Sequence, residues 1–478
     1  MLRPAVGATV GVMTNDARNE QRQPVGTVVV LGASMAGLVA ARVLSERCRR
    51  VIILERDTLP DGPEARRLVP QGRHPHLLLP SGARLFERWF PGLSAELLDA
   101  GAVEIDFCAD FCWQQRGGVQ RRPRSALRGP AMSRPLLEWS VRRRVAALGN
   151  VEIRDETTAS GLLSYPSGDR VTGVRVDGAE DIECDLVVDA TGRQARTLAW
   201  IQEMGYDAPA TSVVQVETRY VSRVFRRTEA ASRDWRAAAA IGGPSTKRLA
   251  MLLPMEDDRW ILGIAGINGE LAPSDDAGML RYLRQFGASV IADVVATSEP
   301  LGEAVTHRYP ANQRRHVERL RRFPTGWVLL GDALCSFDPI YGQGMSSAAL
   351  QSEALGRALE RAGAANRAFA RSYFRAAGRI VNAPWSIAVG GDFAYDGTTG
   401  RKPFGTDFLN RYLDRVIDAG QRDDTVVVRL NEVVALVRSP HWLLAPALVV
   451  RVLRAARRAD GVEGRTSIGP QPTSVIDA

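Results

Sequence analysis

The sequence predicts an α/β protein that combines a dinucleotide-binding domain of the Rossmann type, with a mostly parallel sheet, a second domain built on an antiparallel sheet, and C-terminal helices. Three observations support this prediction. Residues 25–57 read as strand, glycine turn, helix and strand. Residues 206–322 contain alternating apolar runs typical of antiparallel strands, and the chain beyond 365 is helical in pattern and rich in arginine.

The strand-turn-helix unit VGTVVVLGASMAGLVAARVLSERCRRVIILERD occupies residues 25–57. Apolar runs at 28–31 and 51–54 predict two strands. Gly32 permits the tight turn, Gly37 permits close contact between helix and strand, and the helix N-terminus is expected to face a pyrophosphate. Glu55 ends the second strand, where an acid hydrogen-bonds the adenosine ribose. The dinucleotide contacts predicted from this unit are Gly32, Ser34 (in place of the middle glycine), Met35, Ala36, Gly37, Glu55 and Arg56.

A second glycine-rich stretch, GWVLLGDALCSFDPIYGQGMSSAA, occupies residues 326–349. Its apolar run at 327–330 predicts a buried strand, after which the chain turns at Gly331 and Asp332. A helix is then expected from Met345 toward Leu355. A helix that begins behind glycines presents unpaired backbone N–H groups and a partial positive charge, so an electron-rich group is expected in front of it.

The segments between these stretches add further predicted elements. SRPLLEWSVRRR at 133–144 predicts an amphipathic helix led by Arg134, and residues 151–189 predict a small sheet that ends in a strand before DATGR. AGMLRYLRQFGASVIADVVA at 277–296 predicts a helical stretch. HWLLAPALVVRVLRAARRA at 441–459 predicts a basic amphipathic helix, which either packs on its own protein or contacts a membrane or a carrier protein.

Composition excludes several classes of protein. The net charge of +8 comes from arginines interleaved with apolar and acidic residues, which favours solvated helix faces over a nucleic-acid site. Five cysteines without paired CxxC spacing argue against both a disulfide framework and a zinc site. No apolar run approaches the roughly 18 residues of a spanning helix. The first 24 residues lack the apolar core of a signal peptide, so we expect a flexible leader and a cytoplasmic protein.

The motifs resemble, in the same order, those of FAD-dependent monooxygenases of the aromatic-hydroxylase and squalene-epoxidase type. More narrowly, LVPQGRHPHLLLPSGARLFERWFPG (68–92), MSRPLLEWSVR, VVDATGR, the GD stretch and NAPW (382–385) are similar to bacterial polyene epoxidases of polyether biosynthesis, such as those for monensin and lasalocid. The similarity covers about residues 25–395. Two motifs depart from the family: its DG is Thr191-Gly192 here, and its common His-Gly-Met-Ser begins with Gln343.

The resemblance implies an enzyme that keeps FAD bound and uses O2, through a flavin C4a-hydroperoxide, to epoxidise or hydroxylate a bulky apolar substrate. A polyene or polyketide of natural-product biosynthesis, free or attached to a carrier protein, fits that description. The chain has one dinucleotide fingerprint and no second Rossmann unit, so the electrons come either from NAD(P)H bound directly or from a separate flavin reductase. No catalytic side chain is assigned with certainty, because the flavin does the chemistry.

The resemblance also implies roles for residues outside the first unit. Asp332 is expected on the ribityl chain of FAD, and Arg134 on the ribityl and phosphate region. His74 and His76 either border the active site or hold a loop through hydrogen bonds. Trp385 and Asp392 are candidates for the substrate cavity. The remaining predicted FAD contacts are Gly192, Gly331, Pro339, Gly342, Gly344 and Met345.

The implied organisation is a leader at 1–24, the first part of the FAD-binding domain at 25–205, a substrate domain at 206–322, a return segment of the FAD-binding domain at 323–365, and a C-terminal helical region at 366–478. Two other functions stay open: a flavin-dependent reductase of isoprenoid-type double bonds, and a non-catalytic FAD-binding carrier or assembly protein. The halogenase signature WxWxIP is absent, since the nearest tryptophan segment is 258–261.

Overall fold

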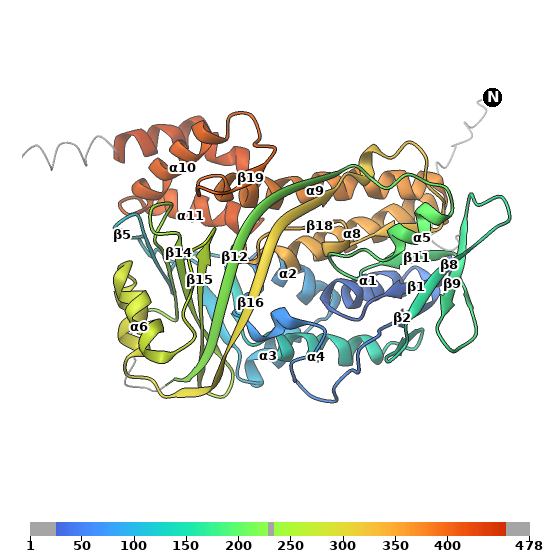
Figure 1. The fold of residues 1–478 in the computed structure, drawn as a ribbon, viewed down its shortest axis with the longest axis horizontal. Helices are drawn as coiled ribbons and strands as arrows, with labels where there is room; N and C mark the ends of the chain where they lie inside the picture. The colour runs from blue at the N-terminus through green and yellow to red at the C-terminus, as the bar shows by residue number, and fades with distance from the viewer. Residues whose placement is uncertain (1–24, 228–233, 456–478) are drawn as a thin grey trace, which may run out of the picture.

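The computed structural model describes residues 25–227 and 234–455, so the predicted leader at 1–24 lies outside the described residues. A parallel sheet of order β17-β11-β1-β2-β7 forms the centre of one lobe (Figure 1). Its strands are β1 (Val25–Leu31), β2 (Cys48–Leu54), β7 (Val151–Arg154), β11 (Leu186–Asp189) and β17 (Trp327–Leu329). Residues 28–30 of β1 are fully buried and pair with β11 on one side and β2 on the other, which confirms the predicted strands.

Helices and a small sheet cover the parallel sheet. The helix α1 (Met35–Ser45) packs between β2 and α8 (Gly344–Ala362), α9 (Arg367–Asp392) packs on α8, and α4 (Arg134–Ala146) packs on α1 and β7. The expected sheet at 151–189 is divided: β7 joins the parallel sheet, because its apolar residues fit beside β2, and the remaining strands form a separate antiparallel sheet against β11. That sheet contains β8 (Ala159–Ser164), β9 (Val171–Val176) and β10 (Ile182–Glu183).

The second lobe is a large, mainly antiparallel sheet of order β18-β16-β12-β15-β14-β13-β4-β5, with β19 paired to β12. Two 16-residue strands, β12 (Thr211–Arg226) and β16 (Pro300–Arg315), run from this lobe toward the lobe that contains the parallel sheet (Figure 1). The other strands are β13 (Ala237–Ile241), β14 (Arg248–Met255), β15 (Arg259–Ile267), β4 (Phe111–Gln115), β5 (Gly118–Val119), β18 (Cys335–Ser336) and β19 (Thr399–Gly400). The sheet therefore recruits strands from outside residues 206–322.

Two helical expectations need correction. The stretch 277–296 is two helices, α6 (Asp276–Gln285) and α7 (Ser289–Val295), because Gly287 takes a positive φ of 79° and breaks the helix. The expected helix at 441–459 is a 3₁₀ turn, η7 (Pro440–Leu444), followed by a new helix from 446 to 455, since Pro446 favours a fresh helix start. Residues 456–459 lie outside the described part of the chain.

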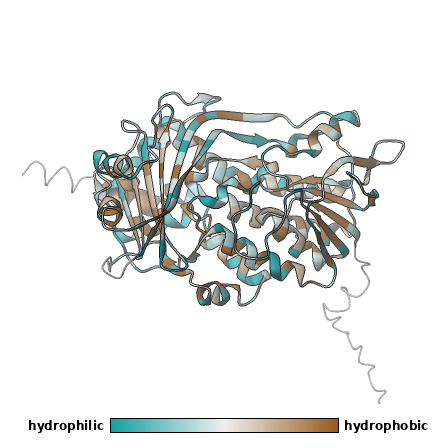
Figure 2. Ribbon diagram, turned by 60° about the horizontal axis from the view of Figure 1, so that its bottom comes forward, coloured by the Kyte–Doolittle hydropathy of each residue, from teal (hydrophilic) through white to brown (hydrophobic). Residues whose placement is uncertain are grey.

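The remaining elements are short or peripheral. They are η2 (Pro70–Arg73), α2 (Pro80–Trp89), α3 (Leu93–Asp99), β3 (Val103–Asp106), β6 (Arg128–Ala131), α5 (Thr197–Glu203), η4 (Val317–Arg319), η5 (Gly331–Ala333), η6 (Pro339–Tyr341), α10 (Thr406–Gly420) and α11 (Asp424–Val434). Figure 2 shows hydrophobic residues concentrated in the strands of both large sheets and hydrophilic residues on outer helix faces. Across residues 25–227 and 234–455, no helix combines the length and the apolar character needed to cross a membrane.

Candidate functional site

The glycines of the βαβ unit are required by packing. A Cβ atom on Gly37 would lie 1.8 Å from the carbonyl oxygen of Gly32, so only glycine lets α1 come this close to the turn. Gly32 has a φ of 100°, and a Cβ there would lie 2.8 Å from the carbonyl oxygen of Ala190. Ser34 begins α1 without a side-chain cap, so the first backbone N–H groups of the helix remain available to an anion.

A buried cluster of charges lies beside this turn. Arg66 joins three carboxylates: its Nη2 is 2.7 Å from Glu55 Oε2, its Nη1 is 2.9 Å from Glu138 Oε1, and its Nε is 3.6 Å from Asp57 Oδ2. Arg134, at the start of α4, donates to the other Glu138 oxygen and to Ser34 Oγ, at 3.0 and 2.8 Å. Burial opposes ionisation of Glu138, but Arg134 and Arg66 outweigh it and hold the pKa of that carboxyl below its usual value.

The predicted ribose contact, Glu55, is held in place by the turn itself. Its Oε2 accepts from the backbone N–H of Ala33 at 2.8 Å and from Arg66, while Oε1 accepts from the N–H of Asp57 at 3.0 Å. A carboxylate oxygen can accept two hydrogen bonds, so Oε1 retains capacity for one hydroxyl donor. The neighbouring Arg56 is exposed. These donors and acceptors fit the adenosine end of a dinucleotide.

Asp332 lies at the other end of this region, in η5. Its side chain keeps solvent-accessible surface, yet the surrounding elements desolvate the carboxyl and raise its pKa, while Arg134 and Arg193 lower it. Arg193 follows β11 and donates from Nη1 to the carbonyl oxygen of Ala311 on β16 at 2.5 Å. Two arginines from different elements therefore flank one accessible carboxyl group.

The start of α8 is open on its outer side. Gly342 takes a φ of 66°, and a Cβ on Gly342, Gly344 or Gly192 would meet no atom within 4 Å. The helix begins at Gly344 without a side-chain cap. Its first-turn N–H groups and the positive end of its dipole therefore face free space, as a site for an electron-rich ring requires.

The strand β12 and the loop after η2 provide the opposite wall. His74 Nδ1 is 2.8 Å from Ser222 Oγ on β12, and the His74 ring lies 5.6 Å from that of His307 and 6.2 Å from that of Tyr220. Desolvation and the neighbouring His307 lower the pKa of His74 to about 4. The His76 pKa falls to about 3, through desolvation and then Arg134. Both histidines are therefore neutral at physiological pH.

A second buried acid network joins this wall to the glycine-rich loop. The Asp338 carboxylate accepts from the hydroxyl of Thr218 at 2.6 Å, from the hydroxyl of Tyr220, and from the N–H of Ile340 at 3.1 Å. The side-chain amide of Asn312 accepts from the Asp338 N–H at 2.7 Å, and donates onward to a further carboxyl group.

That further group is Asp392, at the end of α9. Its carboxyl accepts from Asn312 Nδ2 at 2.5 Å and from the Tyr341 hydroxyl at 3.0 Å. Within the described residues no ion pair joins Asp338 or Asp392 to a basic side chain. Burial therefore raises the pKa of both carboxyls, to about 8 for Asp392, so Asp392 carries a proton at neutral pH.

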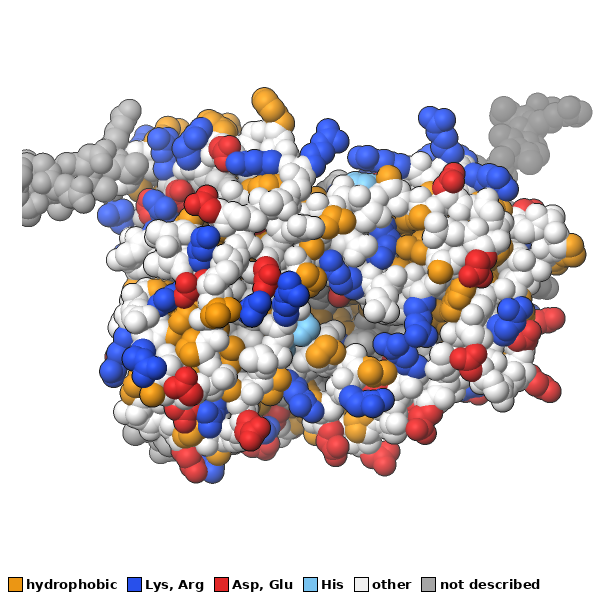
Figure 3. Space-filling view, in the orientation of Figure 1, with side chains coloured by type: hydrophobic (Ala, Val, Ile, Leu, Met, Phe, Trp, Pro, Cys, Tyr) orange, Lys and Arg blue, Asp and Glu red, His pale blue; other side chains and the backbone are white. Residues whose placement is uncertain are grey.

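The structure brings Ser34, Glu55 and Arg134 together around the buried charges beside the first glycine turn, and Arg134 also lies near Asp332 of η5. Figure 3 shows a hollow between the two lobes, with basic side chains around it. Met35 is buried in the core, and Trp385 packs against the same core. Asp392 is fully buried, so it does not line a cavity. The buried Cys335 has its thiol pKa raised by desolvation. Local sequence patterns did not single out Arg66, Glu138, Arg193 or Asp338; for Arg193, the signal in the sequence is the DATGR motif.

Comparisons with solved structures define the class of fold. The flavin-dependent brominase Bmp2 superposes with a TM-score of 0.64 at 13% identity, covering 92% of this chain and 99% of that one. PqsL, a probable FAD-dependent monooxygenase from Pseudomonas aeruginosa, gives 0.58 at 20% identity, covering 78% and 98%. The oxygenase of 2-methyl-3-hydroxypyridine-5-carboxylic acid gives 0.57 at 16% identity, covering 87% and 98%. The fold is that of FAD-dependent monooxygenases and flavin-dependent halogenases.

One curated protein is close enough in sequence to define a family. Protein Rv3254 of Mycobacterium tuberculosis (strain ATCC 25618 / H37Rv) is 34% identical over 394 residues, which are 79% of this chain and 82% of that protein. The chain therefore belongs to the same family as Rv3254. No protein-family model matches the chain.

Proposed function

We propose that this protein is an FAD-dependent monooxygenase that transfers one oxygen atom from O2 to a bulky, largely apolar small molecule. One observation carries the proposal: the exposed Asp332 of η5 lies near Arg134 and Arg193, and η5 packs on α8, whose start is open and lacks a side-chain cap. When bound and reduced, FAD would supply the activation of O2.

Different groups of residues would bind the different parts of FAD. The start of α1 and Arg134 would hold the phosphates, because backbone N–H groups and a guanidinium both donate to anionic oxygens. Glu55 would accept from a ribose hydroxyl through its remaining lone pair. Asp332 would accept from the ribityl hydroxyls, and the first N–H groups of α8 would stabilise negative charge at the pyrimidine end of the ring. The turn at Gly192 is open, because a Cβ there would meet no atom within 4 Å, whereas a Cβ on Gly331 would lie 2.9 Å from the Cβ of Ala36, so glycine there lets η5 approach α1.

The substrate would lie against the wall formed by β12 and β16. Tyr220, His74 and His307 present an aromatic surface there, with the His74 ring tilted by 54° to Tyr220 and by 47° to His307. The surface is uncharged, since both histidines have lowered pKa values. An uncharged aromatic wall favours an apolar ligand and excludes water, which a reactive oxygen-transfer step requires. Epoxidation of a polyene or polyketide is the specific reaction that we propose, with hydroxylation as the alternative outcome.

The decisive experiment combines the protein, FAD, NAD(P)H, a separate flavin reductase and a set of linear polyenes. The expected product gains one oxygen atom, measured by mass spectrometry with ¹⁸O-labelled O2 as the source. Omitting the reductase tests whether NAD(P)H reduces the bound flavin directly. Saturation of the double bond without oxygen incorporation would favour the reductase alternative, and a flavin that no donor reduces would favour the non-catalytic carrier.

The assignment of Asp332 has its own test. Asp332→Ala should purify largely without FAD, because the ribityl chain loses its acceptor, whereas Asp332→Asn should retain part of it. Flavin absorbance per protein and circular dichroism separate loss of cofactor from loss of fold. Full occupancy of the alanine variant would contradict the role given to Asp332.

Halogenation is less favoured than oxygenation, although a brominase shares the fold. The chain lacks the WxWxIP signature of halogenases; the most similar segment, at 258–261, does not match it. Incubation with bromide, O2 and reduced flavin would reveal a halogenated product if this proposal is wrong.

We propose a cytoplasmic location, with the C-terminal helices as the region for contact with a membrane or a substrate-carrying protein. The support is the set of exposed apolar side chains on and beside α10 and η7: Phe404, Phe408, Leu409, Trp442 and Leu444. On the inner side, Leu443 and Leu448 pack into the C-terminal core cluster.

A further inference from the structure

A ladder of like charges runs along the outer face of α9. Arg367, Arg371, Arg375 and Arg379 recur every four residues, and all four are exposed. Residues four apart lie on the same face of a helix, and like charges at this spacing destabilise it. The acidic residue of α9, Asp392, is buried at its far end and offers these arginines no compensation.

The segment after β16 adds arginines opposite the ladder. Arg319, Arg321 and Arg322 are exposed on η4 and the residues that follow it. The neighbouring carboxylate, Glu318, is already engaged by Arg314 at 3.0 Å and by His316 at 3.1 Å. Both contacts use Glu318 Oε1, while its Oε2 is buried without a hydrogen-bond partner.

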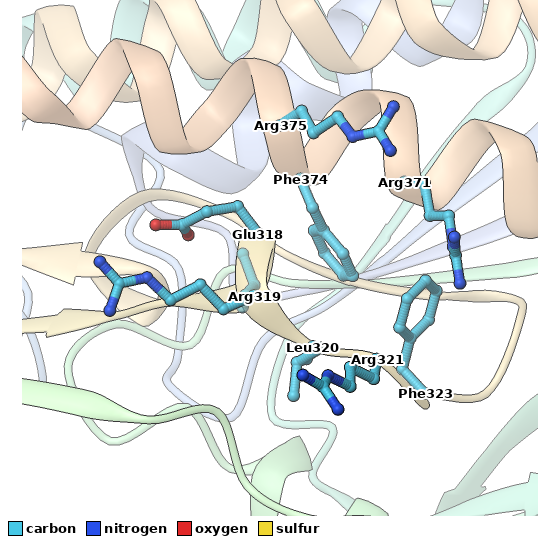
Figure 4. Close-up of a pocket in the computed structure, with 9 residues that line it drawn as sticks. Glu318, Arg319, Leu320, Arg321, Phe323, Arg371, Phe374 and Arg375 are labelled. Atoms are coloured by element: carbon cyan, nitrogen blue, oxygen red, sulfur yellow. The ribbon is translucent and has the colours of Figure 1, made fainter.

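Four of these arginines surround a recess. The cavity of about 270 Å³ is lined by Arg319, Arg321 and the carboxylate residue Glu318 on one side, and by Arg371 and Arg375 of α9 on the other (Figure 4). Among the described residues, no ion pair links any of these four to a carboxylate. Elsewhere on the surface exposed arginines do find acids, as Arg116 does with Asp414 and Asp418.

The base of the recess is aromatic. Phe323 and Phe374 lie between the two arginine-bearing segments, with ring centroids 5.3 Å apart in an edge-on arrangement (Figure 4). Both rings are almost fully buried in the main core, so the floor is fixed by packing. The recess is thus a rigid apolar base with a flexible, positively charged rim.

We propose that this recess binds a small molecule that carries phosphate groups. A phosphate monoester brings nearly two negative charges at neutral pH, and guanidinium groups bind its oxygens in pairs. The volume is near the lower end of small-molecule sites, roughly 300 Å³, so the recess suits a compact anionic group better than a protein surface. The charge that costs α9 stability is then compensated by the ligand.

This site is separate from the proposed cofactor region. The recess is lined by η4, the loop after it and α9, whereas the cofactor region is formed by the turns after β1, β11 and β17. The two sites are linked through the segments between them: the Arg315 N–H donates to the carbonyl oxygen of Leu334 at 3.0 Å, and the Tyr373 hydroxyl of α9 donates to that of Leu329 on β17 at 2.8 Å. The proposal therefore holds whether or not the protein is an oxygenase.

The test uses the full chain saturated with FAD, so that a nucleotide cannot enter the cofactor region. Adenosine 2′,5′-bisphosphate and adenosine 5′-monophosphate differ by one phosphate and serve as the probe pair in isothermal titration calorimetry at low salt. The bisphosphate should bind at least tenfold more tightly, and its affinity should fall as salt is added. Inorganic diphosphate should compete with it.

The variant Arg371→Gln/Arg375→Gln should weaken bisphosphate binding at least tenfold. The matched control, Arg401→Gln/Arg411→Gln, removes two exposed arginines elsewhere and should leave the affinity unchanged. Circular dichroism checks that both variants fold. Equal binding of the two probes, or equal loss in both variants, would overturn the proposal. Binding only to phosphatidylglycerol vesicles, lost in the first variant, would also overturn it and assign the arginines to a lipid surface.

Discussion

The protein contains two buried acid clusters, and they differ in what compensates the buried carboxyl groups. In the cluster beside the first glycine turn, Arg66 and Arg134 compensate Glu55 and Glu138, and the Glu138 pKa is lowered. In the cluster of Asp338 and Asp392 only neutral donors are present, and both pKa values are raised. The difference teaches that hydrogen bonds alone do not keep a buried carboxyl ionised, whereas a buried cation does.

The largest effect should come from removing the cation of the first cluster. Arg66→Met leaves Glu55 and Glu138 buried without their shared partner, and breaking a buried pair in this way costs about 3–5 kcal/mol. Urea unfolding measures the loss. The control Arg50→Met breaks an exposed pair with Glu152 and should cost no more than about 1 kcal/mol. Similar losses in both variants would show that the first cluster does not depend on its cation.

A smaller effect is expected when the neutral bridge of the second cluster is removed. Asn312→Leu leaves the Asp338 N–H and one Asp392 oxygen without partners, at about 1–3 kcal/mol for each buried group. Unfolding by urea again gives the value. The comparison is Asn410→Leu, which loses the hydrogen bond from the Asn410 side-chain amide to the half-buried carbonyl oxygen of Gly390. No measurable loss from Asn312→Leu would mean that the network contributes nothing to stability.

The raised pKa of Asp392 predicts the sign of a pH effect. The folded state holds a proton up to about pH 8 that the unfolded state loses near pH 4, so stability from this group falls as the pH rises from about 4 to about 8. Asp392→Asn resembles the protonated acid and should flatten this slope with little change at pH 5. Melting temperature across pH 4–9 checks it; a slope that persists in the variant would refute the assignment.

The smallest effect is expected for His74. Its pKa is lowered, so its contribution to stability changes with pH in the opposite direction to that of Asp392. The unfolded chain binds a proton near pH 6.5, and the folded chain binds one only near pH 4, so stability falls as the pH drops through that interval. His74→Gln should remove this acid-side slope while leaving the slope from Asp392 in place. The same melting series, extended to the double variant, shows whether the two slopes are independent.

Local sequence patterns were sufficient to predict the main strands and helices of the lobe that contains the parallel sheet. The strands at 28–31 and 51–54, the helix led by Arg134 and the helix after Gly344 all appear where the apolar spacing and the caps placed them. Ser133 caps α4 by accepting from the N–H of Leu136, and Pro135 lies at its first turn. Each of these signals acts within a few residues, so a linear reading captures it.

The sequence did not predict which strands pair when they are far apart in the chain. The strand β4 joins the large sheet beside β13, although more than 100 residues separate the two strands. The strand β7 pairs with β2 in the parallel sheet and not with β8, β9 or β10, which follow it in the chain. Arg66 was overlooked because no residue next to it in the chain identifies it; its acidic partners are at positions 55, 57 and 138.

The sequence by itself determined the βαβ unit, the glycine loop before α8 and the order in which they occur, because glycine conformations, strand periodicity and helix starts are local properties. Only the tertiary structure decided which charges are compensated. Asp332, Asp338 and Asp392 look alike in the chain, yet one is accessible between two arginines and two are buried without a cation. Burial and neighbours set a carboxyl group's charge, and both arise only when distant segments pack together.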